Sequence, residues 1–344
     1  MGLTLPMVWA SFYALSPVCV AACMVLVLLL ALWIDHRWGE PPMAFHPVVW
    51  IGHYLKACGH VSVRCPPALA FVLGALAWGV GAVVAGALAW GLQALTFWQL
   101  ARFSARPDLA RAMAVILLVA MMAWLAKSML SWRMLHDEVS AVEAALRQSL
   151  DAGRERLSWL VSRDTAKLTE AEVRESAIET LAENLNDSVV APMFWFVLFG
   201  LPGAAVYRFA NTADAMWGYR GLRHGVNWEC AGKWAAWADD ALSWLPARLT
   251  ALLLMGLAGQ FQFGRLRREA AKTPSPNSGW PMAAMALALG VSLGKPGVYT
   301  LNATGRAPQA SDLLLAQKYA SKVLFAQVAC ALLAMISVAF VIRW

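Results

Sequence analysis

The sequence has 344 residues, of which 60% are apolar and only 14% are charged, and its mean hydropathy is +0.55. Soluble domains carry roughly 45–50% apolar and about 25% charged residues. The composition therefore excludes a disordered chain, a disulfide-rich secreted scaffold and an ordinary water-soluble enzyme. Eighteen tryptophans, a residue that gathers at membrane–water interfaces, point to an integral membrane protein.

The net charge is +7, but its distribution is uneven. Residues 132–188 contain 12 of the 21 acidic residues and only 7 of the 28 basic ones. The remaining bases are scattered beside apolar runs, as expected of topology determinants and lipid-headgroup contacts. The lipid bilayer is thus an expected partner and nucleic acid is not. The six cysteines form no C-x-x-C pair and predict neither a metal site nor a disulfide framework.

Apolar stretches of the length needed to cross a bilayer recur along one membrane domain, 1–344. We expect an all-α polytopic protein with about four to six transmembrane or re-entrant helices plus amphipathic helices. The second stretch is too long for one upright helix and too short for two, which predicts a tilted helix. The apolar stretches are 17–34, 67–98, 109–131, 189–206, 241–260 and 321–342. The polar segments between them are 35–66, 132–188, 207–240 and 261–320.

Counting crossings exposes a conflict. If all six stretches cross, segment 207–240 lies on the opposite face from the other three polar segments, which the basic cluster of 265–272 assigns to the cytoplasm. Stretch 189–206 contains two prolines and two glycines, and 241–260 contains Pro246. We therefore predict that these two stretches dip into the membrane and return. The alternative keeps six spans, with the 207–220 helix sunk into the bundle and reached from inside.

The acidic segment 132–188 contains two predicted helices. Leucines and valines from Leu135 to Leu150 recur every three or four residues, which predicts an amphipathic helix. Thr169 and Glu172 have the spacing of a capping box, so a second helix should begin there.

Acidic and amide side chains follow one face of that second helix. Carboxylates four residues apart repel each other, and the only base nearby, Arg174, projects to the opposite side, so no base is expected to relieve the stripe. The stripe therefore predicts a hard cation such as Mg²⁺ with a bound nucleotide; an acidic surface helix beside a basic neighbour stays open. Its members are Glu172, Glu175, Glu179, Glu183, Asn186 and Asp187.

Two further polar groups lie beside apolar stretches. Helical projection of 207–220 places Arg208, Asn211, Thr212 and Tyr219 on one strip, with Asp214 beside it. Polar residues at such positions mark a functional site by default, although a hydrogen-bonded seam between helices is the alternative. The pair Asp239-Asp240 suggests a second metal or phosphate site, or else a plain interface pair.

Familiar nucleotide and metal motifs are absent from the sequence. It contains no G-x-x-x-x-G-K-[ST], no G-x-G-x-x-G and no H-E-x-x-H. A G-x-S-x-G match at 290–294 lacks the preceding strand that a nucleophile elbow needs. His46, His53 and His60 repeat every seven residues, which on a helix separates them by about 10 Å, too far for one zinc ion. Any nucleotide site must therefore be of an unusual kind.

Short motifs recur through the polar segments from residue 35 to about 299. They are Asp35, Gly39-Glu40-Pro41-Pro42, His46-Pro47-Val48, Ile51-Gly52, Arg163-Asp164-Thr165, Glu175, Glu179, Ala182-Glu183-Asn184, Asp187, Ala191-Pro192, Tyr207-Arg208, Asn211-Thr212, Asp214, Met216, Gly218-Tyr219-Arg220, Asp239-Asp240, Pro246-Ala247-Arg248-Leu249-Thr250 and Ser275-Pro276-Asn277-Ser278-Gly279-Trp280-Pro281. Taken together, these motifs resemble the adenosylcobinamide-phosphate synthase family of cobalamin biosynthesis. The sequence departs from the family pattern at Ser188, Ser243 and Met282 and in the ending over 300–320.

The resemblance implies an ATP- and Mg²⁺-dependent amide ligase of the cytoplasmic (inner) membrane, with its active face toward the cytoplasm. Its substrates would be adenosylcobyric acid and aminopropanol or the O-phosphate of aminopropanol. Other membrane enzymes of the same pathway are possible partners. A non-catalytic membrane sensor on the same fold and a corrinoid transporter are the alternatives.

Roles for individual residues follow from that resemblance. Acid–base and orienting roles are expected of Glu179, Glu183, Asp187, Asn211 and Asp214. Binding of the nucleotide and its phosphates is expected of Arg163, Arg208, Arg220, Arg248 and Asn277, with Arg223 as a weaker candidate. Metal binding is expected of Glu179, Glu183, Asp187, Asp239 and Asp240.

Overall fold

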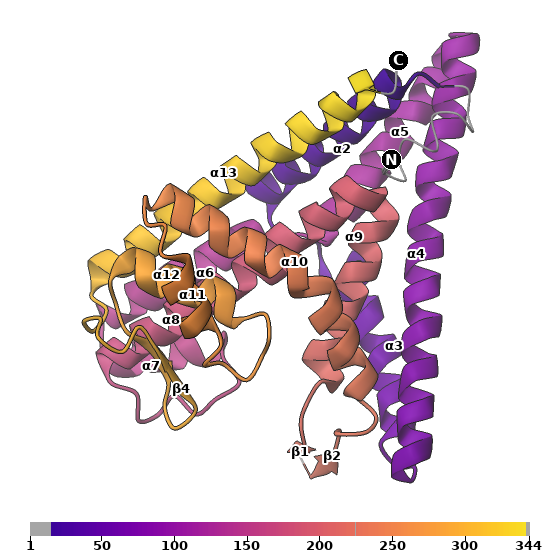
Figure 1. Cartoon of the computed structure of the whole chain (residues 1–344). Coiled ribbons are helices and arrows are strands. Elements are labelled where there is room, and N and C mark those ends of the chain that lie inside the picture. Colours follow the sequence, from indigo (N-terminus) through magenta and orange to yellow (C-terminus); the bar gives the residue numbers. More distant parts are fainter. Residues whose placement is uncertain (1–14, 224, 342–344) are drawn as a thin grey trace. The chain divides into compact units, whose positions relative to one another are not determined.

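A computed structural model describes residues 15–223 and 225–341, and the described chain is almost entirely helical, as predicted (Figure 1). It divides into two compact units. The first contains the chain up to Ser131, Ala191–Leu242 and the chain from Ala329; the second contains Trp132–Val190 and Ser243–Val328. The only strands in the described residues form two short antiparallel hairpins, one in each unit.

The first unit is built on long apolar helices, several of which begin at a proline. Proline suits the first helical position because it lacks an N–H that would have no partner there. The predicted helix over 67–98 is confirmed as one 39-residue helix, α4. The elements are α2 (Pro17–Trp38), η1 (Met43–Phe45), α3 (Pro47–Ser62), α4 (Pro67–Ala105), α5 (Leu109–Ser128), α9 (Ala191–Trp217), β1 (Leu222–Arg223), β2 (Val226–Asn227) and the first part of α10 (Lys233–Leu257).

Helix α4 organises this unit by packing against α3, α5 and α9. Small residues make the close approach possible. A Cβ atom on Gly81 would lie 2.2 Å from Cζ of Phe209, which is far inside van der Waals contact. Phe209 and Trp217 of α9 are buried there with Leu55 of α3, so this core joins three helices.

Helix α9 is broken near its middle, within the stretch 189–206. Gly200 has φ +70° and ψ −158°, which lies outside the helical region and is readily reached only by glycine. The N–H of Leu201, which the break frees from helical pairing, donates to Oε1 of buried Gln93 on α4 at 2.9 Å. In the other irregular stretch, Pro246 lies inside α10 without ending it. The dipping of the two stretches stays a prediction.

The second unit holds shorter helices around α8. Its elements are α6 (Trp132–Leu146), α7 (Leu150–Ser158), α8 (Glu170–Leu185), the π-helix η2 (Asn186–Val190), the end of α10, α11 (Phe263–Ala270), α12 (Gly279–Leu289), β3 (Leu293–Lys295), β4 (Tyr299–Leu301) and α13 (Ala310–Val341), whose last residues belong to the first unit. Helix α8 packs against α6, α12 and β3.

Local sequence signals are largely confirmed in this unit. Thr169 and Glu172 form the predicted capping box at the start of α8. The apolar face of α6 is buried as expected, but its extension to Leu150 is wrong: the helix ends at Leu146, and Ser149 caps a new helix by accepting from the N–H of Ala152 at 3.1 Å. A serine hydroxyl at this position competes with helix continuation because it satisfies the backbone of the following turn.

The hairpin β3–β4 turns at Pro296-Gly297. Gly297 has φ +73°, and the N–H of Val298 donates to the carbonyl of Lys295 at 2.9 Å. Proline followed by a glycine with positive φ is the signature of a type II turn. The register pairs Lys295 with Tyr299 across the hairpin.

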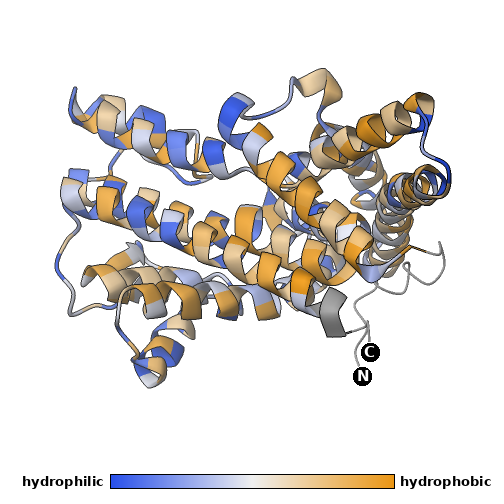
Figure 2. Cartoon of the chain, turned by 90° about the horizontal axis from the view of Figure 1, so that it is seen from above, coloured by the Kyte–Doolittle hydropathy of each residue, from blue (hydrophilic) through white to orange (hydrophobic). Residues whose placement is uncertain are grey.

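Five helical stretches in the described residues are long and apolar enough to cross a membrane, so the chain is a multi-pass membrane protein. They are Pro17–Trp38, Pro67–Ala105, Leu109–Leu146, Glu170–Trp217 and Ala310–Ser337. Hydrophobic colour runs along the long helices in Figure 2. Helix α8 contributes five glutamates to the fourth stretch, so the part of it that suits a membrane is α9. Residues 241–260 are not among the five, and residue 342 of the last predicted span lies outside the described residues.

Candidate functional site

A polar cavity of about 190 Å³ lies in the second unit. Three pieces of chain form it: the loop before α8, one face of α8, and the β3–β4 hairpin. Most of its exposed lining is polar, in contrast to the apolar helices elsewhere. The lining residues are Leu160, Val161, Ser162, Arg163, Ser176, Glu179, Thr180, Glu183, Asn184, Lys295 and Tyr299.

Arg163 and Glu179 form an ion pair at the cavity wall. Nη2 of Arg163 lies 3.2 Å from Oε2 of Glu179 and also donates to the hydroxyl of Ser176. Nη1 of Arg163 is buried and has no acceptor among the described residues, and the buried Oε1 of Glu179 accepts no hydrogen bond of good geometry from them. Buried polar atoms are normally hydrogen-bonded, so this wall has binding capacity for a ligand.

The carboxylates of α8 are tuned by burial. Burial raises the pKa of Glu179, while Arg163 opposes the shift. Burial, together with the charges of Glu179 and Glu172, raises the pKa of Glu175 to about 7. Burial and the adjacent Glu179 raise the pKa of the Tyr299 hydroxyl above its ordinary value. The face of α8 thus carries less negative charge near neutral pH than its sequence suggests.

The acidic stripe is only partly what the sequence predicts. Arg174 does point away from it, pairing with Glu143 at 2.8 Å and Glu170 at 2.6 Å. The expectation that no base relieves the stripe is wrong, because Arg163 reaches it from the preceding loop. Helical projection misses this contact, which a loop makes from outside the helix. Glu172 is occupied by the helix cap, with Oε2 2.7 Å from the N–H of Thr169.

Of the five predicted metal-binding carboxylates, Glu179 and Glu183 line the cavity, whereas Asp187, Asp239 and Asp240 are not among its lining residues. Asp187 lies in the π-helix η2, where its Oδ1 accepts from the amide of Asn186 at 2.7 Å. Over residues 15–223 and 225–341, no group of three or more His, Cys, Asp or Glu side chains is placed to hold a metal ion. Mg²⁺ binding therefore needs oxygen atoms from a ligand as well, as is usual for Mg²⁺ on phosphates.

Arg248 and Asn277, also in the second unit, contact each other directly. Nη1 of Arg248 donates to Oδ1 of Asn277 at 2.6 Å, and Nη2 donates to the carbonyl of Pro276 at 3.0 Å. The guanidinium group lies 4.6 Å from the ring of Trp244 and 4.8 Å from that of Trp280. These contacts fix the guanidinium; its predicted role in phosphate binding stays a prediction.

In the first unit, the polar residues of 207–240 form separate contacts. The amide of Asn211 donates to Oδ1 of Asp239 at 3.4 Å, joining α9 to α10. Arg208 donates to the hydroxyl of Ser131 at 3.3 Å. Burial raises the pKa of Asp240, and the positive charge of Arg220 opposes this rise.

The helical strip predicted over 207–220 is wrong at one position. Helix α9 ends at Trp217, so Tyr219 lies beyond it; the N–H of Gly218 still donates to the carbonyl of Asp214 at 2.7 Å. The guanidinium group of Arg223 stacks over the ring of Tyr219, 3.6 Å from the ring centre, in a cation–π contact.

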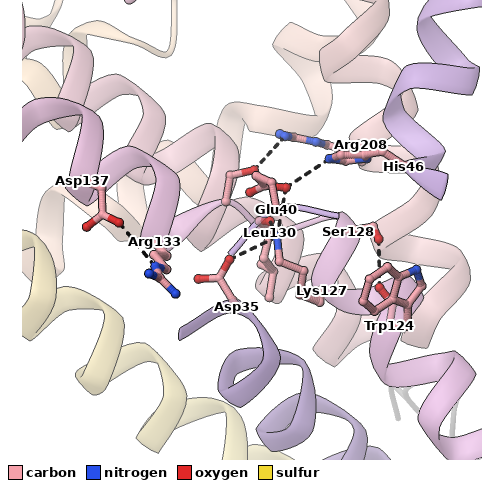
Figure 3. A network of polar contacts seen from close by, with 11 residues as sticks. Asp35, Glu40, His46, Trp124, Lys127, Ser128, Leu130, Arg133, Asp137 and Arg208 are labelled. Carbon is pink, nitrogen blue, oxygen red and sulfur yellow. Dashed lines mark hydrogen bonds and ion pairs between the residues drawn. The ribbon is translucent and has the colours of Figure 1, made fainter. Parts of the chain in front are cut away.

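A second charged group in the first unit surrounds a lysine that the sequence analysis did not single out. We call Asp35, Glu40, His46 and Lys127 the Lys127 cluster (Figure 3). Nζ of fully buried Lys127 lies 3.2 Å from Asp35 and 2.9 Å from Glu40, and Nε2 of His46 lies 3.0 Å from the same Glu40 oxygen. Burial would raise the pKa of Glu40, but His46 and Lys127 outweigh it and hold that pKa below its ordinary value.

Sequence signals existed for some of the missed residues. Lys127 is an isolated positive charge in the last turn of the apolar stretch 109–131. Asp35 is an isolated negative charge at the end of the apolar stretch 17–34. Isolated charges at such positions imply partners of opposite charge. Lys295 and Tyr299 gave no comparable signal, because nothing in the sequence places the 294–297 turn beside α8.

Comparisons with known proteins agree with these motifs. Residues 28–324 match the family model described as CobD/Cbib protein. The chain is 41% identical over 287 residues to the probable cobalamin biosynthesis protein CobD of Thermococcus kodakarensis, covering 83% of this chain and 87% of the relative. It is 40% identical over 272 residues to the cobalamin biosynthesis protein CobD of Chromobacterium violaceum, covering 78% and 81%. No solved structure matches.

Proposed function

Since the chain belongs to the CobD/Cbib family of cobalamin biosynthesis, we propose that it is a membrane-bound amide ligase that consumes ATP. Its carboxylate substrate is adenosylcobyric acid, and its amine substrate is aminopropanol or the O-phosphate of aminopropanol. The product is adenosylcobinamide or its phosphate. The membrane is the cytoplasmic membrane of the cell, with the reaction on the cytoplasmic face where ATP is available.

Formation of an amide from a carboxylate and an amine needs groups of the kind found in the second unit. A carboxylate does not react with an amine until its oxygen is converted into a leaving group, most simply by transfer of the γ-phosphoryl group of ATP to give an acyl phosphate and ADP. The amine then attacks the acyl carbon, phosphate leaves, and a base takes the proton from nitrogen. Cations must stabilise the transferring phosphoryl group, and a carboxylate of suitable pKa must accept the proton.

The observation that carries the proposal is the cavity around Glu179. It combines two carboxylates, a polar lining and a guanidinium whose buried Nη1 has no acceptor among the described residues. Mg²⁺, when bound, neutralises phosphate charge; Glu179 and Glu183 would hold it together with phosphate oxygens. Arg163 would orient the phosphates, and Glu175, whose pKa lies at about 7, is the neighbouring carboxylate best poised to exchange protons near neutral pH.

The other predicted residues keep supporting roles in this proposal. Arg208, Asn211, Asp214, Arg220, Asp239 and Asp240 form polar contacts in the first unit, and Arg248 with Asn277 forms another in the second. We propose that Arg248 and Asn277, in the same unit as the cavity, bind the remaining part of the nucleotide. The predicted roles of the groups in the first unit stay predictions.

The experiment that tests the function uses the full chain purified in detergent. It is incubated with adenosylcobyric acid, aminopropanol O-phosphate and Mg-ATP, with free aminopropanol in a parallel reaction. A corrinoid product heavier by the amine minus water, formed only when ATP is present, is the expected result. A product in neither reaction, with the substrates intact, would contradict the ligase and favour a sensor or transporter.

Re-entrant stretches 189–206 and 241–260 would place all four polar segments on the cytoplasmic face. Single cysteines replacing Asn227 and Gln309, in a chain without native cysteines, test this with a membrane-impermeant thiol reagent on intact cells. We expect neither position to react before the cells are opened. Labelling at 227 but not at 309 would overturn the re-entrant arrangement.

A further inference from the structure

The β3–β4 hairpin contributes two side chains to the cavity that no motif of the sequence indicates. Lys295 and Tyr299 are direct cross-strand partners, and residues opposite each other on paired strands point to the same side of the ribbon. Both line the cavity on α8, and β3 packs against α8. The tight turn at Pro296-Gly297 fixes their spacing, so the hairpin presents them as one unit.

The cavity then has two cations and two carboxylates in a small space. Arg163 enters from the loop before α8 and Lys295 from the hairpin, while Glu179 and Glu183 come from α8. Arg163 uses Nη2 for Glu179 and Ser176, and keeps a buried Nη1 with no acceptor among the described residues. A planar guanidinium matches phosphate oxygens, and an ammonium acts on them as a point charge.

The size of the cavity limits what it can hold. Its volume of about 190 Å³ lies below the roughly 300–1,000 Å³ of pockets that enclose a whole drug-sized ligand. A whole nucleotide or a corrinoid ring is too large for it, whereas a phosphoryl group with a few neighbouring atoms fits. The cavity therefore suits a phosphoryl group, either at the end of a larger ligand such as a nucleotide or on a small phosphorylated molecule.

We propose that Lys295 and Arg163 together bind a phosphoryl group in this cavity. The proposal rests on the proposed function for the source of that group. The terminal phosphate of ATP and the phosphate of the amino alcohol share the chemistry that the two cations recognise.

The first test measures binding without turnover. Mg-ATP alone and aminopropanol O-phosphate alone are titrated by calorimetry into the full chain and into Lys295→Met and Lys295→Arg. Loss of a charge-assisted contact should weaken the binding of one or both probes at least tenfold in Lys295→Met, with Lys295→Arg recovering most of it. The probe that weakens identifies the source of the phosphoryl group.

Lys167→Met is the matched control, because Lys167 is an exposed lysine four residues from Arg163. It removes the same charge from the same unit without touching the cavity, and it should bind both probes as the wild-type chain does. Equal binding by Lys295→Met and wild type, equal losses in Lys295→Met and Lys167→Met, or no binding of either probe to wild type would each overturn the proposal.

The second test measures product formation in the wild type and in Lys295→Met. Probe binding that depends on Lys295 without product formation in the wild type would contradict the ligase but support this site. Product formation with an unchanged KM in Lys295→Met would contradict this site but support the ligase.

Discussion

Charged side chains gather in two contrasting places, the Lys127 cluster of the first unit and the Glu179 cavity of the second. In the cluster, one fully buried ammonium lies within 3.2 Å of two carboxylates, and a histidine adjoins one of them. In the cavity, Arg163 has a single ion pair and a buried nitrogen with no acceptor among the described residues. In the first arrangement the cation is paired with two carboxylates, although the buried Oε1 of Glu40 accepts no hydrogen bond of good geometry from the described residues. In the second arrangement the cation itself keeps a nitrogen without an acceptor.

This difference separates stability from binding. A buried charge must be paired, and removing one partner leaves the other uncompensated. The Lys127 cluster should therefore tie the end of α2, the following loop and the end of α5 together. An incompletely paired group lining a cavity instead gains its partners from a ligand, so its removal should change function more than stability.

The largest expected effect is on stability and comes from Lys127→Met. The substitution keeps the length of the side chain but leaves Asp35 and Glu40 without their cation, which in a buried pair costs about 3–5 kcal/mol. We expect a large fall in the thermal unfolding temperature of the detergent-purified chain. Lys56→Met, at an exposed position of α3, is the control and should be nearly neutral. A Lys127→Met protein as stable as this control would show that the cluster does not hold the fold.

The next effect should appear in activity alone. Glu183→Gln keeps the size of the side chain and removes a carboxylate from the cavity, so we expect kcat/KM for the ligase reaction to fall on the order of 100-fold, as for a lost electrostatic contact in a transition state. Thermal stability should be unchanged or higher, because repulsion along α8 decreases. Normal turnover at limiting Mg²⁺ would remove the predicted metal role of Glu183.

A smaller effect should follow pH. The pKa of Glu175 is raised to about 7 from an ordinary value of 4.5, so the folded chain holds this proton more tightly than the unfolded chain. The stability contributed by the bound proton is present below pH 4.5 and is lost as pH rises toward 7. Unfolding temperatures of wild type should therefore decline over this interval more steeply than those of Glu175→Gln. Parallel profiles would contradict the raised pKa.

The smallest effect is expected where a charge is exposed and belongs to neither group. Asp137 lies 3.3 Å from Arg133 on the surface of α6, and exposed pairs contribute about 0–1 kcal/mol. Asp137→Asn should change unfolding temperature and activity by little more than the experimental error. A marked loss of stability or activity would show that this exposed ion pair is a third charged group on which the protein depends.

Composition and local patterns in the sequence predict the class of the protein and part of its local structure. Hydropathy predicts the long helices, because apolar runs of this length have few other stable states. Thr169 marks a helix cap correctly, since a cap acts through the backbone within a few residues. The motifs from Asp35 to Pro281 also indicate the family, and they include Arg163, Glu179 and Glu183.

Only the tertiary structure decided which charges meet. Arg163 reaches Glu179 from 16 residues away, Lys295 reaches the same cavity from the far side of a hairpin, and Lys127 meets Asp35 and Glu40 across two helix ends. Helical projection describes neighbours within one element, whereas these contacts depend on how separate elements pack. Electrostatic pairing acts through space over a few ångströms, and distance along the chain carries no information about it.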